Sequence, residues 1–191
     1  MAAKKRKQRH RRGGSKGSGG GARKTSITLR ELSPGQFELV PPRCARERRA
    51  DMEEVYAMLD AGEEEVAIDE LRWLLEDCTD FPEAHRLLGE LALADGDAQL
   101  ARGHFGYAYD LCRAALAGKR GIQLAVESAE TQVFLEAAKG LVWALSQLGR
   151  RHTAAAIARN VLELVPADPL NFAELLTSLD GAPPDPPEED P

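Results

Sequence analysis

The chain has 191 residues, of which 43% are hydrophobic, and a formal net charge of −6. This length allows one domain with a core plus further segments, and no apolar run approaches the roughly 18 residues that would span a bilayer. The basic N-terminus lacks the apolar stretch of a secretory signal, so we expect a cytoplasmic monomer, or a nuclear one in a eukaryote. Alanine and leucine dominate the hydrophobic residues, which favours an all-α fold.

Basic residues are concentrated at the N-terminus. Residues 1–30 hold eleven Lys or Arg and no acid, which leaves fourteen basic residues against 31 acidic ones in the rest of the chain. Residues 1–25 contain almost nothing apolar, so they cannot offset the entropy of ordering, and we expect them to be disordered. We assign residues 1–42 to a basic, low-complexity arm and linker.

Residues 26–42 leave two alternatives open. Their apolar side chains could dock as an extended strap on the body of the protein. Alternatively, this stretch is a plain linker, broken by Ser33-Pro34-Gly35 and by Pro41-Pro42.

Helical periodicity begins after Pro42, and residues of one kind then recur every 34 positions. This spacing separates Gly62 from Gly96 and Ala67 from Ala101, and predicts two units at roughly 48–81 and 82–115. A third match follows an insert at about residues 116–134, and consists of Leu141, Gly149, Ala154, Ala158, Val161 and Pro166. Val66, Leu71 and Leu74 are expected on the buried face of the first unit. Asp168-Pro169 is typical of a helix start and predicts a final helix.

The second unit carries the clearest motif. Leu88-Gly89, Ala101, Phe105 and Ala108 have the spacing of large and small residues at close helix contacts. This pattern resembles the tetratricopeptide repeat, although another helical-hairpin array with similar spacing is the alternative. The resemblance implies a right-handed α-solenoid of about three helical hairpins over residues 43–179, including a C-terminal capping helix. Residues 180–191 are then an acidic, Pro-rich disordered tail.

The resemblance also implies a function. In tetratricopeptide arrays the first helix of each hairpin lines a concave groove that binds a peptide or protein segment, which makes this chain a non-enzymatic interaction scaffold. The candidate groove residues are Arg49, Met52, Tyr56, Glu83, Arg86, Glu90, Lys139, Trp143 and Gln147. Because Glu83 and Glu90 stand among them, a clamp for a peptide carboxylate is disfavoured, and a mixed-charge or basic ligand fits better.

The basic arm suggests an alternative function. It could bind nucleic acid or the ribosome by neutralising phosphates, serve as a nuclear import signal, or only solubilise the chain. The candidate phosphate-binding residues are Lys4, Lys5, Arg6, Lys7, Arg9, Arg11 and Arg12.

Neither the cysteines nor the histidines form a catalytic or metal-binding pattern, so we expect no enzyme activity, metal or cofactor. The three cysteines, Cys44, Cys78 and Cys112, are each 34 residues apart. At equivalent places in successive repeats they would lie too far apart for a disulfide. We therefore expect small buried apolar residues and, from them, a reducing compartment.

Overall fold

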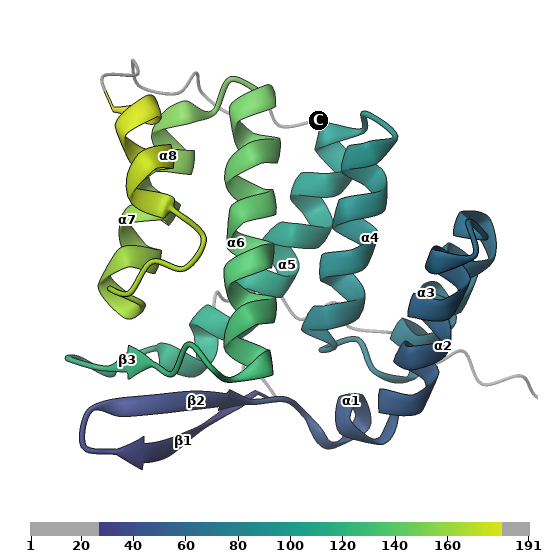
Figure 1. Ribbon diagram of the computed structural model, residues 1–191, viewed down its shortest axis with the longest axis horizontal. Coiled ribbons are helices and arrows are strands. Elements are labelled where there is room, and N and C mark those ends of the chain that lie inside the picture. Colours follow the sequence, from purple (N-terminus) through teal and green to yellow (C-terminus); the bar gives the residue numbers. More distant parts are fainter. Residues whose placement is uncertain (1–26, 181–191) are drawn as a thin grey trace, which may run out of the picture.

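The computed structural model describes residues 27–180, so the predicted disorder of residues 1–25 and of the acidic tail lies outside the described range. Within this range eight helices pack in sequence order beside a small three-stranded sheet (Figure 1). The elements are β1 (Thr28–Ser33), β2 (Gln36–Val40), α1 (Arg43–Glu47), α2 (Arg49–Asp60), α3 (Glu64–Asp77), α4 (Pro82–Ala94), α5 (Ala98–Leu116), β3 (Gln123–Leu124), α6 (Ala129–Gln147), α7 (Arg151–Leu164) and α8 (Phe172–Leu179). The helical prediction is confirmed, but an all-α fold is wrong because of the sheet.

Helices α2–α7 form three consecutive hairpins with the same turn. Gly62, Gly96 and Gly149 occupy the three turns with φ angles of 77°, 79° and 76°. Glycine adopts this left-handed backbone without the steric cost that a side chain brings, so it ends the first helix of each pair. The 34-residue spacing of Gly62 and Gly96 is therefore the spacing of hairpin turns, and Gly149 occupies the third turn.

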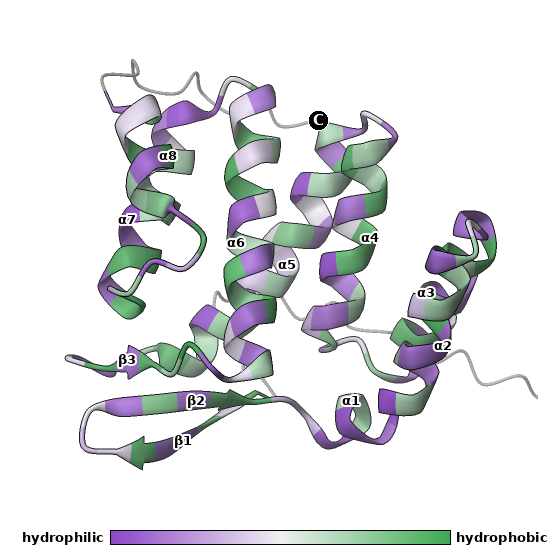
Figure 2. Ribbon diagram, in the orientation of Figure 1, coloured by the Kyte–Doolittle hydropathy of each residue, from purple (hydrophilic) through white to green (hydrophobic). Residues whose placement is uncertain are grey.

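The predicted spacing also places small residues at equivalent buried positions. Ala67, Ala101 and Ala154 are fully buried in the second helix of each hairpin. Val66 does not fit the prediction, because 52% of its surface is exposed. In Figure 2 hydrophobic and hydrophilic stretches alternate along the helices, as expected for helices that bury one face.

Phe105 on α5 holds three helices together. A Cβ atom built on Gly89 of α4 would lie 2.8 Å from its ring, and one built on Gly140 of α6 would lie closer still. The ring is 1% exposed and sits between these two glycines. The sequence predicted that Gly89 lies at a close helix contact and that Phe105 fills a gap, but not that the two meet, and Gly140 was missed.

The sheet resolves the two alternatives for residues 26–42. β1 and β2 form an antiparallel hairpin, whose turn carries Gly35 at φ 81° after Pro34, as a type II turn requires. Ile27 and Leu39 are 4% and 2% exposed and join the helical core. Because the hairpin docks on the body, a plain linker for residues 27–42 is wrong.

The insert after α5 pairs with this hairpin. β3 runs parallel to β2, and the amide of Ala125 donates a hydrogen bond of 2.8 Å to the carbonyl of Phe37. The insert is absorbed by this strand and by long flanking helices, since α5 and α6 each have 19 residues. The sheet lies across the ends of α5 and α6 (Figure 1).

A disulfide joins Cys44 to Cys78, with 5.7 Å between their Cα atoms, so the expectation of unpaired cysteines is wrong for these two. One helical hairpin returns the chain to its start, which brings the end of α3 beside α1. Arg48, between α1 and α2, forms an ion pair of 2.7 Å with Asp77 at the end of α3, next to the disulfide. Cys112 alone is a free buried cysteine. The cysteines therefore no longer support a reducing compartment.

Helix α8 covers α7 at the end of the stack. Asp168 was expected to cap it, and its carboxylate accepts hydrogen bonds from the amides of Phe172 and Ala173. The helix begins at Phe172, later than predicted, because Asp168 and Asn171 have φ angles of 47° and 60°.

None of the helices between residues 27 and 180 is long and apolar enough to cross a membrane.

Substitutions around Phe105 test the central contact. Gly140→Ala or Gly89→Ala should lower the free energy of unfolding by about 1–3 kcal/mol, because the ring has no free side into which to move. Phe105→Ala should cost about 3–5 kcal/mol by leaving a cavity. Chemical denaturation measures both changes.

Gly103→Ala is the matched control for these substitutions. Gly103 is on α5, as is Phe105, and a Cβ atom on Gly103 meets nothing within 4 Å. This change should therefore be neutral or stabilise the helix by up to about 1 kcal/mol. Equal destabilisation by Gly103→Ala and Gly140→Ala would contradict the packing argument.

Reduction tests the disulfide. It closes a loop with a sequence separation of 34, so dithiothreitol should lower the free energy of unfolding by about 2–4 kcal/mol. The double variant Cys44→Ala, Cys78→Ala should be about as stable as the reduced wild type, and the reductant should not change its free energy of unfolding. A wild-type denaturation midpoint that is unchanged by reduction would show that the bond does not stabilise the fold.

Candidate functional site

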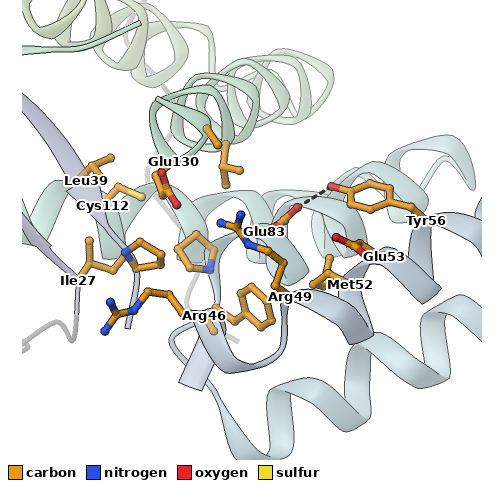
Figure 3. A pocket seen from close by; sticks show the side chains of 16 residues that line it. Ile27, Leu39, Arg46, Arg49, Met52, Glu53, Tyr56, Glu83, Cys112 and Glu130 are labelled. Carbon is orange, nitrogen blue, oxygen red and sulfur yellow. Dashed lines mark hydrogen bonds between the residues drawn. The ribbon is translucent and has the colours of Figure 1, made fainter. Parts of the chain in front are cut away.

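A pocket of about 260 Å³ lies where the first helices α2, α4 and α6 meet α1 and the strand hairpin. We call it the interhelical pocket (Figure 3). At one end Ile27, Leu39 and Cys112 form an apolar wall, and Glu53 and Tyr56 lie at the other end. Ile27, Leu39 and Cys112 belong to the larger core cluster, whereas Met52 belongs to the smaller one around α2 and α3. The pocket therefore occupies the seam between two cores.

Charged side chains of both signs surround the opening. Arg46 and Arg49 are exposed and form no ion pair with another residue in the range 27–180. Glu53 and Glu130 carry the opposite charge. The carboxylate of Glu83 accepts a hydrogen bond of 2.8 Å from the hydroxyl of Tyr56 (Figure 3). An apolar interior with a mixed-charge rim suits an apolar side chain of a bound peptide, whose polar backbone and charged neighbours stay at the rim.

Arg86 on α4 connects the three first helices next to the pocket. It is 7% exposed, and its guanidinium donates to Glu90 at 2.6 Å and to the hydroxyl of Tyr56 on α2 at 2.8 Å. Its Nε atom lies 3.3 Å from a carboxylate oxygen of Glu136 on α6, although without the alignment of a hydrogen bond. Burial disfavours its charge, but the negative charges of Glu90 and Glu136 outweigh burial and raise the pKa of Arg86.

Tyr56 is fixed by this network. Its hydroxyl donates to Glu83 and accepts from Arg86. Burial raises the pKa of Tyr56 to about 12, and the neighbouring carboxylate acts in the same direction. The ring is therefore held neutral at the edge of the pocket, where 37% of the residue is exposed.

The pocket brings together some of the predicted groove residues and not others. Those that line it are Arg49, Met52, Tyr56 and Glu83. Those outside it are Arg86, Glu90, Lys139, Trp143 and Gln147. Two of the nine are not accessible as expected, because Met52 is 2% and Arg86 7% exposed. Trp143 is 50% exposed on α6. The candidate phosphate-binding residues Lys4–Arg12 lie outside the described range.

Sequence reasoning missed the residues that α1 and the hairpin contribute. Arg46 comes from α1, which has only five residues and gives no periodic signal. Leu39 comes from β2, in the stretch whose sequence is compatible with both a docked strap and a linker. The alternation of Phe37 and Leu39 after Pro34-Gly35 is the signal that could have found the hairpin.

Two histidines meet at the α4–α5 contact. The Nε2 atom of His85 lies 3.0 Å from the carbonyl of Thr79, so it carries the proton and donates. The Nδ1 atom of His85 is then an acceptor, and it lies 3.2 Å from Nδ1 of His104. A second proton on His85 would set two N–H groups against each other. Burial lowers the pKa of His85 to about 4 and also lowers the pKa of His104.

The described residues hold no group of three or more His, Cys, Asp or Glu that could bind a metal ion. Cys112 is 2% exposed, and burial raises the pKa of its thiol to about 12. A thiol in this environment is a poor nucleophile.

No protein-family model, curated protein or solved structure matches this chain.

The histidine pair predicts a pH dependence of stability. An unfolded histidine takes up its proton near pH 6.5, whereas folded His85 does so near pH 4. The unfolded state therefore binds more protons in this window, and stability is lost as the pH falls through it. Asp80 opposes this effect at His85, and Arg72 reinforces it at His104.

Denaturant titrations at pH 7 and pH 4.5 measure this effect. The wild type should lose about 2–3 kcal/mol more than His85→Gln between the two pH values. Equal losses in both proteins would contradict the prediction, because they would show that protonation of His85 does not contribute to the loss of stability at low pH.

Proposed function

We propose that the chain is a non-enzymatic interaction module that binds an extended segment of a partner protein in the interhelical pocket. The observation that carries this proposal is the combination of an apolar interior with Arg46 and Arg49 at the opening. These two arginines form no ion pair with residues 27–180, so a ligand can pair with them without breaking an existing contact. Glu53 beside them favours a segment with charges of both signs.

The size of the pocket supports a protein ligand over a cofactor. Pockets for drug-sized molecules span about 300–1,000 Å³, whereas a cavity of about 150 Å³ already holds benzene. The interhelical pocket, with about 260 Å³, lies between these values. It suits one large apolar side chain, anchored there while its neighbours contact the charged rim.

We further propose that the three hairpins are tetratricopeptide-like and form a right-handed solenoid with α8 as its cap. The common turn at Gly62, Gly96 and Gly149 supports this proposal, as does burial at Ala67, Ala101 and Ala154. In such an array the first helices line the binding surface, and α2, α4 and α6 each contribute to the lining of the pocket.

Nucleic-acid or ribosome binding through the basic arm stays a prediction. Its support is the charge split of the sequence, with eleven basic residues and no acid in residues 1–30. Such binding would weaken steeply with salt, because it comes from released counterions. Binding in the interhelical pocket would persist at moderate salt.

Selection from random peptides tests the proposed function. Twelve-residue peptides displayed on phage are selected on the full-length protein, and synthetic versions are measured by fluorescence anisotropy. We expect a large apolar residue flanked by charges of both signs. Val133→Trp, which fills the pocket, and Arg49→Glu, which reverses a rim charge, should each weaken binding at least tenfold, or about 1.4 kcal/mol.

Leu100→Ala is the control, because it changes an exposed apolar residue outside the pocket. Peptides that bind all three variants equally would contradict the proposal. Peptides lost only with Trp143→Ala would place the binding site on α6 instead of in the pocket.

A further inference from the structure

A second groove, of about 1,100 Å³, lies between α5 and α7. We call it the α5–α7 groove. Leu141 and Leu145 of α6 contribute to its lining. On the α5 side the lining includes Gly103 and Gly106, which have no side chain to fill the groove. It shares no lining residue with the interhelical pocket.

The charge of this groove is opposite to that of the body. Residues 27–180 hold fifteen basic and 27 acidic residues. Three of these basic residues, Arg102, Arg113 and Arg150, line the groove, but only one acidic residue, Asp110, does so. A positive groove on an acidic body selects an anionic occupant.

The chain itself supplies a segment of that chemistry. Residues 181–191, with the sequence G-A-P-P-D-P-P-E-E-D-P, contain four acidic residues, five prolines and no basic residue. They follow α8, whose end is fastened to α7, one wall of the groove. The carboxylate of Asp180 lies 2.6 Å from the guanidinium of Arg159, and Arg151 donates to the carbonyl of Ser178 at 3.0 Å.

The length of the segment fits the distance to be covered. A helix with its side chains is about 10 Å wide, and the four residues 181–184 reach roughly 13 Å when extended, which is enough to cross α7. The seven residues that remain reach roughly 22 Å in a polyproline II conformation. Arg102 and Arg113 are eleven residues apart on α5, or about 16 Å. Acidic residues after position 184 therefore fall within reach of both arginines.

We propose that residues 181–191 dock in the α5–α7 groove, with Asp185, Glu188, Glu189 and Asp190 facing the arginines. The prolines limit the conformational entropy that is lost on docking. The docked segment excludes other polyanions from the groove, so it acts as an internal competitor for nucleic acid or acidic proteins. This proposal does not depend on the function of the interhelical pocket.

Amide chemical shifts of the full-length protein test the proposal. The comparison is between the wild type and a neutral-tail variant, Asp185→Asn, Glu188→Gln, Glu189→Gln, Asp190→Asn, at 50 mM salt. We expect shift differences at Gly103, Gly106 and Asn160, which line the groove, and none in α2 and α3. At 500 mM salt these differences should vanish, because screening weakens the ion pairs. Differences confined to residues 181–191 would overturn the proposal.

Two further arms exclude other causes. Arg113→Gln should reproduce the shift differences of the neutral-tail variant along α7, whereas Arg72→Gln on α3 should not. A random-sequence single-stranded RNA of twelve nucleotides should shift the groove amides more in the neutral-tail variant than in the wild type. Equal shifts of the groove amides by this RNA in both proteins would mean that the groove is an open nucleic-acid site, and would overturn the proposal.

Discussion

The contact of Phe105 with two glycines fixes the spacing of the central helices. With Gly89 on one side of the ring and Gly140 on the other, α4 and α6 approach α5 through backbone rather than through side chains. This close approach brings α4 near α6, where Arg86 lies 3.3 Å from Glu136, and on its other side Arg86 donates to Tyr56 on α2. The part of the polar network that joins α4 to α6 thus depends on an apolar contact in the core. Buried ion pairs gain little by themselves, so we regard the Phe105 contact as the cause and the Arg86 network as the feature that orients the helices.

The interhelical pocket exists because the two core clusters do not merge. The smaller cluster joins α1–α3 to the start of α4, and the larger one contains α5–α8 and the strand hairpin. The disulfide and Arg48 tie α1 to the end of α3 within the smaller unit. The wall formed by Leu39 belongs to the other unit. A side chain bound between the two would contact both cores, and its binding energy would add to the attachment of the first hairpin.

The sequence predicted what depends on neighbouring residues and missed what depends on distant ones. Glycine at a helix end and alanine at a close contact act over a few residues, so the hairpins and their turns could be found. The pairing of Cys44 with Cys78, of Phe37 with Leu124 and of Arg86 with Glu136 depends on how whole elements return to one another. The candidate site follows the same division. Residues on predicted helices, such as Arg49 and Glu83, were found, whereas Arg46 and Leu39 belong to elements whose position only the assembled fold reveals.

The pairing of β2 with β3 has a consequence during synthesis. Phe37 pairs with Leu124, which is 87 residues later in the chain. At a translation rate of about 5–20 residues per second the hairpin waits roughly 4–17 s for its partner, and for the part of α6 that completes the pocket. During this time the edge of β2 is open to other strands, which is the condition that favours aggregation. The ion pair of Arg30 with Glu38 joins β1 to β2 and so supports the pairing that covers the other edge of β2. Only the edge of β2 that later receives β3 therefore stays open while the rest of the sheet is being made.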